Sequence, residues 1–207
     1  MKPSVTAVVV SHDEPTYLRQ TLEAVSRQTH RPDHLFVVDS SQNNQQSVLE
    51  VIEQFPAATG IRAPGDSSLQ QSVNLALAQL QPGLNDEQNL DGKSQQWLWL
   101  LHDDSAPEPN VLELLLAKVE VSTTVAVAAP KLLRWESPKI IQQLGLTLTR
   151  SGELFNRVSG EIDQSQHDQD EDVLAVGTAA ALYSLTVFQK LEGFDDSAPQ
   201  LAQDYDF

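Results

Sequence analysis

The chain has 207 residues, of which 29 are acidic and 13 are basic, so its formal net charge is −16. This balance argues against nucleic acid as a partner, because binding to a phosphate backbone needs a clustered basic face. The absence of cysteine excludes disulfides, thiolate metal sites and cysteine nucleophiles. No apolar run reaches the roughly 18 residues of a membrane-spanning helix, and the N-terminus lacks a signal peptide's apolar core. We therefore expect a soluble, cytoplasmic globular domain.

Strands and helices are predicted to alternate through the first 120 residues. Val5 to Val10 is rich in β-branched residues and bounded by polar ones, which is typical of a buried strand. Pro15 suits the first turn of the helix that follows. The same patterns predict further strands over 34–38, 60–63 and 97–101, and helices over 15–28, 44–55, 69–80 and 110–121, with a polar surface loop over 81–96. Such alternation is typical of right-handed βαβ units and a mostly parallel sheet.

The regular alternation of strands and helices is not predicted to continue in the remainder of the chain. Strands are predicted over 125–129, 144–149 and 173–183, with a short helix over 186–191. The stretch 161–172 holds six acids and neither lysine nor arginine. Such a run is typical of a solvated, mobile loop rather than a metal site. Neither an internal repeat nor a linker divides the sequence, so we expect a single domain over 1–207.

Three predicted strands end in polar, mostly acidic tips. The tips are Ser11-His12-Asp13, Asp39-Ser40-Ser41 and His102-Asp103-Asp104. Parallel strands bring their C-terminal ends to one edge of a sheet, where ligands bind in open α/β folds. A single acid after a strand more often caps the next helix, but three tips at one edge favour a ligand site. Paired carboxylates suit a divalent cation, and such a cation suits a diphosphate.

Four motifs in the chain resemble those of the family 2 glycosyltransferases, enzymes of the GT-A fold that use nucleotide-activated sugars. In order, the motifs cover 8–12, 36–40, 100–104 and 193–196. The resemblance implies an α/β fold with a Rossmann-like, mostly parallel central sheet flanked by helices and a smaller mixed sheet in the C-terminal part. It divides the single domain into a nucleotide-binding half, 1–105, and an acceptor and catalytic half, 106–207.

The resemblance also assigns the residues that would bind the donor. Asp39 matches the acid that recognises the base, and Asp66 and Asn74 match donor contacts by position. For Asp66, capping of the next helix is the alternative. The complete set that would border the donor is Ser11, His12, Glu14, Asp39, Asp66, Asn74 and Asp103.

The family's metal motif falls on residues 102–104. Asp104 would bind the metal that bridges the donor diphosphate, and Asp103 would contact the ribose or support the site. His102 replaces the family's usual first acid; it could face the metal or the ribose, although a hydrogen bond at the strand end is the simpler role. Mg²⁺ or Mn²⁺ would offset charge on the leaving diphosphate as a Lewis acid. The acidic chain offers few cations to replace the metal; Arg62, Lys131 and Arg134 are the candidates, with solvated surface charge as their simpler role.

The end of the chain carries the expected catalytic base. Residues 203–207 match an acidic motif of the family, with Gln203 in place of its first acid. Asp204 is then the candidate general base of an inverting transfer, taking the proton of the acceptor hydroxyl. Trp135 is a candidate for stacking on an acceptor sugar, whereas Trp97 and Trp99 alternate on one strand and are predicted to pack in the core.

We therefore predict a metal-dependent glycosyltransferase that moves a sugar from a nucleoside diphosphate to a glycan or lipid-linked acceptor. Family members normally continue beyond this motif, so we expect a piece of a longer protein, associated with the inner face of a membrane through other regions. Two alternatives stay open. The substitutions at His102 and Gln203 allow a catalytically silent binding or scaffold domain. A nucleotidyltransferase is disfavoured, since the loop after the first strand lacks the glycine-rich, basic sequence of that class.

Overall fold

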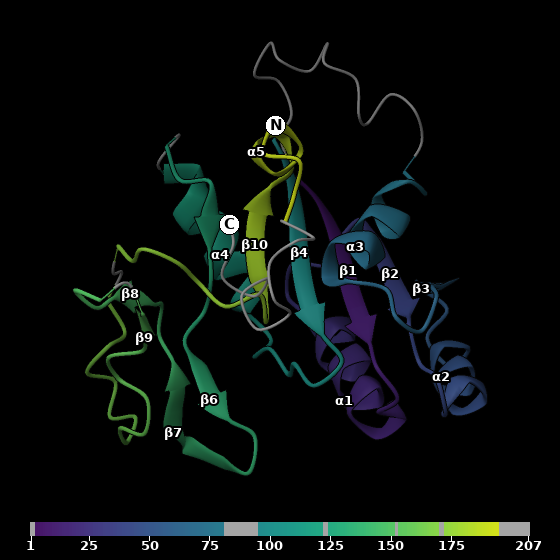
Figure 1. Cartoon of the computed structure of the whole chain (residues 1–207), viewed down its shortest axis with the longest axis horizontal. Coiled ribbons are helices and arrows are strands. Elements are labelled where there is room, and N and C mark those ends of the chain that lie inside the picture. Colours follow the sequence, from purple (N-terminus) through teal and green to yellow (C-terminus); the bar gives the residue numbers. More distant parts are fainter. Residues whose placement is uncertain (1–2, 81–94, 122–123, 152, 170–171, 195–207) are drawn as a thin grey trace.

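The computed structural model of the chain describes residues 3–80, 95–121, 124–151, 153–169 and 172–194. A six-stranded sheet lies at its centre, in the order β3-β2-β1-β4-β10-β5 (Figure 1). Its strands are β1 (Ser4–Ser11), β2 (His34–Asp39), β3 (Ala58–Arg62), β4 (Gln96–His102), β5 (Val127–Ala128) and β10 (Ala181–Ser184). Strands β1 to β4 run parallel to one another, while β10 is antiparallel to both β4 and β5. The predicted mostly parallel sheet is confirmed.

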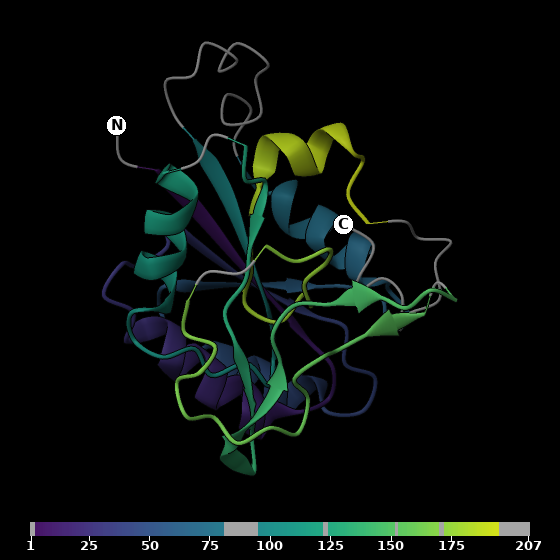
Figure 2. The same ribbon diagram turned by 90° about the vertical axis from the view of Figure 1, so that its left-hand side faces the viewer.

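Helices cover both faces of this sheet (Figure 2). Their bounds are α1 (Pro15–Ser26), α2 (Gln45–Ile52), α3 (Leu69–Leu77), α4 (Val111–Val121) and α5 (Leu185–Lys190). Apolar side chains of α1, α2 and α4 pack on one face, and those of α3 and α5 pack on the other. None of the helices in the described ranges is long and apolar enough to cross a membrane.

Strand β4 shows how the alternation of side chains builds two cores from one strand. Trp97, Trp99 and Leu101 belong to the core beneath α1 and α4, whereas Leu98 and Leu100 belong to the core beneath α3 and α5. Successive side chains of a strand point to opposite faces of the sheet. The indole N–H of Trp99 donates to the carbonyl of Ala180 at 3.1 Å, which satisfies its buried polar atom. The prediction that both tryptophans pack in the core is confirmed.

The part after β5 differs from the prediction. It contains two small antiparallel sheets, formed by β6 (Leu132–Arg134) with β7 (Ser137–Gln143) and by β8 (Thr147–Leu148) with β9 (Leu154–Phe155). The strand predicted over 144–149 shrinks to β8, and the one over 173–183 shrinks to β10. Ala180 adopts φ 61°, a left-handed turn that prevents a continuous strand through residues 173–183. Strand β7 is mostly polar and exposed over about half of its residues, so its sequence lacks the apolar pattern that predicts a buried strand.

The acidic stretch is anchored to this part of the molecule. Lys131 donates to Asp163 at 2.8 Å and to Asp168 at 2.5 Å. Ile162 also forms a β-bridge with Ile140. The described residues of the stretch are mostly exposed, as predicted, but two of its acids hold Lys131. That lysine is therefore already neutralised and is poorly suited to replace a metal. The loop predicted over 81–96 lies almost wholly outside the described residues.

Candidate functional site

The three acidic tips meet at one edge of the central sheet, as the sequence predicts. In the register of the parallel strands, Ser11 at the end of β1 pairs with Asp39 at the end of β2. On its other side β1 pairs with β4, and Val10 is opposite His102. Residues 11–13, 39–41 and 102–104 are thus neighbours, although up to 93 positions separate them in the sequence.

Asp103 is the buried centre of this edge. Its Oδ2 accepts hydrogen bonds from the backbone N–H of His12 at 2.7 Å and from the hydroxyl of Ser11 at 3.0 Å. The hydroxyl of Thr21 donates to its carbonyl oxygen at 2.7 Å. Burial raises the pKa of Asp103, and the charge of Asp104 adds to the effect, while the two hydrogen bonds oppose it. Asp103 therefore braces the end of β1 against the end of β4, and the hydroxyl of Ser11 points to Asp103.

Asp104 has the opposite environment, although it is the next residue. Its side chain is exposed, and it makes no hydrogen bond or ion pair with any described residue. A carboxylate that is held at a strand end by its buried neighbour, and that has no partner among the described residues, is available to bind a ligand. Asp104 is therefore the best placed of the predicted residues to bind a cation.

His102 is hydrogen bonded within the protein. Its Nε2 lies 2.8 Å from the hydroxyl of the buried Thr178, and its backbone N–H donates to the hydroxyl of Ser105 at 3.1 Å. A hydrogen bond at the strand end is the simpler role that the sequence favours for His102, and the structure shows it. It links β4 to Thr178, three residues before β10 begins.

The described residues contain no group of three or more histidine, aspartate or glutamate side chains arranged to hold a metal ion. A self-contained metal cage is therefore absent from this part of the chain. Mg²⁺, however, is commonly bound by one or two carboxylates, with substrate phosphates and water completing its shell. The exposed Asp104 fits that second arrangement.

Asp39 forms an ion pair with Arg62 in which the carboxylate is nearly buried and the arginine is exposed. Its Oδ2 accepts from Nη1 of Arg62 at 2.6 Å, and its Oδ1 accepts from the backbone N–H of Ser41 at 2.9 Å. The carboxylate side chain is 10% exposed, against 44% for the arginine. Arg62 also donates to the carbonyl oxygen of Ser41. The arginine therefore neutralises Asp39 and fixes the loop after β2.

The remaining residues predicted at the nucleotide are exposed, but they differ in how firmly they are held. His12 is bound through its Nδ1 to the hydroxyl of Ser40. Glu14 is the N-cap residue of α1 and makes no capping hydrogen bond with its side chain. Asp66 lies in the turn before α3, but that helix is capped by Ser68, which forms a capping box with Gln71. The helix-capping alternative for Asp66 is therefore wrong.

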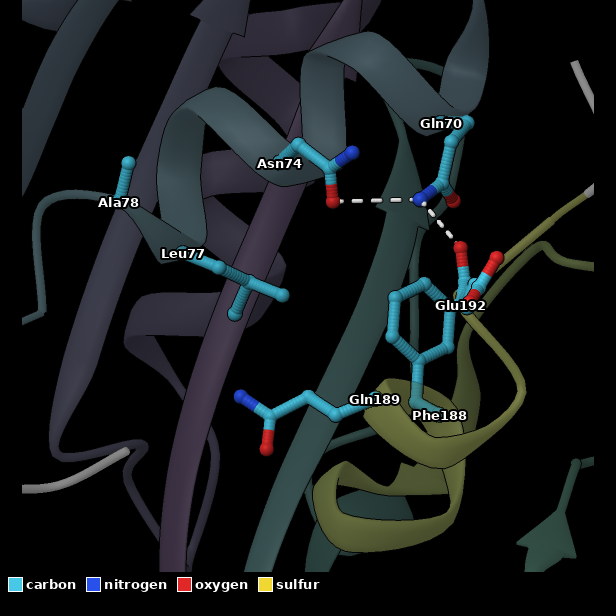
Figure 3. A pocket seen from close by; sticks show the side chains of 8 residues that line it. Gln70, Asn74, Leu77, Ala78, Phe188, Gln189 and Glu192 are labelled. Carbon is cyan, nitrogen blue, oxygen red and sulfur yellow. Dashed lines mark hydrogen bonds between the residues drawn. The ribbon is translucent and has the colours of Figure 1, made fainter. Parts of the chain in front are cut away.

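Asn74 lies away from the acidic tips, in a pocket between α3 and α5 (Figure 3). Its Oδ1 accepts from Nε2 of Gln70 at 3.2 Å. The pocket has a volume of about 360 Å³ and is lined by Gln70, Asn74, Leu77, Ala78, Phe188, Gln189, Glu192 and Gly193. None of the strand-end residues lines it, so the structure does not bring Asn74 together with them.

Three contacts at or beside the site were missed by the sequence analysis. The carboxylate of Asp13 binds the loop that precedes α2. Gln70 binds the turn that follows α5. Trp135, 39% exposed, packs edge-on against Tyr17 in the first turn of α1, with ring centroids 5.2 Å apart. No local pattern reveals any of these pairs. The expected base, Asp204, lies outside the described residues.

Solved structures share this fold. A crystal structure of S. aureus TarS 1–349 in complex with UDP-GlcNAc matches with a TM-score of 0.58 at 12% sequence identity, covering 98% of this chain and 53% of that one. The same TarS fragment in complex with UDP matches with a TM-score of 0.57 at 12% identity, covering 97% and 52%. The expected GT-A class of fold is thereby confirmed.

Residues 3–207 match the family model described as glycosyltransferase like family 2, and the chain belongs to this family. It is 32% identical over 139 residues to galactofuranosyltransferase GlfT1 of Mycobacterium tuberculosis (strain CDC 1551 / Oshkosh), an alignment that covers 67% of this chain and 42% of that protein. It is 26% identical over 177 residues to GlfT1 of Mycolicibacterium smegmatis, covering 82% and 51%. The chain thus spans about half the length of these relatives.

Proposed function

We propose that this chain is the glycosyltransferase domain that moves a sugar from a nucleoside-diphosphate donor to a glycan or lipid-linked acceptor. The observation that carries the proposal is the contrast between Asp103 and Asp104 at the end of β4. The first is buried and holds the end of β1, while the second is exposed and has no partner among the described residues. A cation at a diphosphate is commonly bound by one or two protein carboxylates together with the phosphates, and Asp104 is the carboxylate that this strand end leaves exposed.

The nucleotide would lie over the ends of β1 and β2. His12 would border the base, with its ring oriented by Ser40. Asp39, fixed by its ion pair with Arg62, would accept a hydrogen bond from the base or the ribose. Glu14 and Asp66 would reach the donor from the flanking loops. Ser11 would act indirectly, because its hydroxyl donates to Asp103. Asn74 lines the separate pocket between α3 and α5, so its role at the donor is the least supported of the set.

Mg²⁺ or Mn²⁺ bound by Asp104 would supply Lewis-acid stabilisation of the charge that develops on the leaving diphosphate. The protein's own contribution is to hold that carboxylate exposed at the end of β4. His102 would orient the same strand end through Thr178 rather than bind the cation. The net charge of −16 makes the cation more necessary, since the protein would otherwise repel a diphosphate.

The acceptor would bind to the half of the domain formed by 106–207, with the nucleotide on 1–105. Asp204 would take the proton of the acceptor hydroxyl in a transfer with inversion. Trp135, held against Tyr17, would offer its exposed ring to an acceptor sugar. Since the relatives named galactofuranosyltransferase are up to 32% identical, galactofuranose is the first donor sugar to test. Association with the inner face of a membrane would depend on regions outside this chain.

The test is a thermal-shift series with UDP, GDP, dTDP and CDP, each with and without Mn²⁺ or Mg²⁺. A ligand at 100 times its Kd stabilises the native state by about 2.7 kcal/mol, which is roughly 5–10 °C in Tm for a chain of this size. We expect one nucleotide to produce this shift only when the metal is present. Asp104→Asn should abolish the shift without lowering the Tm of the free protein.

Glu108→Gln is the matched control, because it removes the same charge from an exposed side chain four residues away. It should leave the shift intact. If Asp104→Asn retains the full metal-dependent shift, the assignment of the metal ligand is wrong. A nucleotide that binds without any transfer from labelled donor, when the acceptor glycan is supplied, would favour the silent binding domain.

A further inference from the structure

The carboxylate of Asp13 joins the loop after β1 to the loop after β2. Its Oδ1 accepts from the backbone N–H groups of Asn43 and Asn44, both at 2.8 Å, and its Oδ2 accepts from the backbone N–H of Gln42 at 3.2 Å. The side chain of Asn43 adds a fourth contact, 3.3 Å from Oδ2. Three successive peptide N–H groups that converge on one anion form a tight, directional site for it.

The backbone of Asp13 takes part in the same junction. Its N–H donates to the hydroxyl of Ser41 at 3.2 Å, and its carbonyl accepts from the side chain of Asn44 at 2.7 Å. The residue adopts φ 58°, a left-handed conformation that costs a residue other than glycine roughly 1 kcal/mol. Such a conformation persists only where surrounding contacts fix it, and here those contacts all come from 41–44.

The joined loops are the two that would hold the nucleotide. His12, immediately before Asp13, is bound to Ser40 through its ring and to Asp103 through its backbone. Asp39 lies two residues before Ser41 and is bound to its N–H. The contacts of Asp13 thus fix the loop that carries His12, which is expected at the base, relative to the loop that carries Asp39, which is expected to recognise the base.

We propose that Asp13 is a positioning residue that presets the donor site, holding the loop of His12 against the loop of Asp39 before any nucleotide arrives. This inference rests on the proposed function. A site that is already ordered binds more tightly, because the ordering entropy is not lost on binding. Removal of the carboxylate therefore weakens donor binding while the acceptor side and the step of transfer stay unaffected.

The test compares Asp13→Gly with Asp13→Ala and the wild-type protein. Glycine adopts φ 58° without strain, so Asp13→Gly removes the carboxylate and keeps the backbone turn, while Asp13→Ala removes the carboxylate and keeps the strain. We expect both variants to raise the Kd of the nucleoside diphosphate, and the donor KM, by about tenfold with kcat within about twofold. Amide hydrogens of 42–44 should exchange faster in both variants when no ligand is bound.

Glu53→Ala is the control, because it removes an equal charge from an exposed side chain at the other end of α2. It should leave Kd, KM and exchange unchanged. Equal donor affinity in the wild type and Asp13→Gly would refute the inference and leave the proposed function standing. A wild-type protein that binds no nucleoside diphosphate would refute the proposed function, and this inference with it.

Discussion

Gly193 lies where an added methyl group would strike the side chain that anchors the end of α5. The residue has φ 81°, and a Cβ at its position would lie 2.2 Å from Oε1 of Gln70. That side chain is 6% exposed. It accepts from the backbone N–H of Phe194 at 2.7 Å and donates to the carbonyl of Glu192 at 3.0 Å. Gly193→Ala should therefore expel Gln70 from the turn (Figure 3).

Two terms give the magnitude. An alanine in the left-handed conformation costs about 1–2 kcal/mol. The amide of a glutamine is the end of a flexible side chain, so it can move away, and the second term is the hydrogen bonds lost by that movement. Two such bonds at a buried turn contribute about 1 kcal/mol each, and more if the N–H of Phe194 is left without a partner. The sum is about 3–4 kcal/mol, or roughly 6–16 °C in Tm.

Thermal unfolding of matched variants measures this loss. Gly160→Ala is the control, because Gly160 has φ 89° and the nearest atom to its added Cβ would be 3.9 Å away, on Arg134. It carries only the backbone term, about 1–2 kcal/mol. In a Gln70→Ala background, Gly193→Ala should likewise lose only that term, since the obstruction is gone. Equal losses for Gly193→Ala and Gly160→Ala in the wild-type background would refute the argument.

Two further predictions concern charge. Burial raises the pKa of Asp103 in the folded state, so the stability that this group contributes is present below the ordinary aspartate pKa of 3.8 and is lost as the pH rises through the folded value. The Tm of Asp103→Asn should therefore rise relative to that of the wild type as the pH rises. A difference in Tm that is independent of pH would contradict this. Hydrogen bonds from Lys131 lower the pKa of Asp163 and Asp168, so their contribution is present above 3.8 and is lost as the pH falls through the folded values. Lys131→Met should lower the Tm at neutral pH more than the control Lys139→Met, which replaces an exposed lysine. The difference in Tm between the two variants should disappear in acid. A difference that grows in acid would contradict the role of the ion pairs.

Prediction from sequence was most successful where the pattern is local. The β-branched run of β1 and the tryptophans of β4 identify buried strands, and the alternation with helices identifies a parallel sheet. A parallel sheet then brings residues 11, 39 and 102–104 to one edge without any further information. The prediction fails after β5, where strands are short, exposed and interrupted by left-handed residues such as Ala180.

The site itself divides in the same way. The sequence by itself determined that acids would gather at the strand ends, because strand direction follows from the order of the elements; that one of them binds a metal stays a prediction. Only the tertiary structure decided which acid is buried and which is free, that Arg62 neutralises Asp39 and that Asp13 joins two loops. These pairings depend on strand register and on the backbone angles of loops, which no local periodicity encodes; contacts between residues 23 to 124 positions apart form only when the whole sheet is assembled.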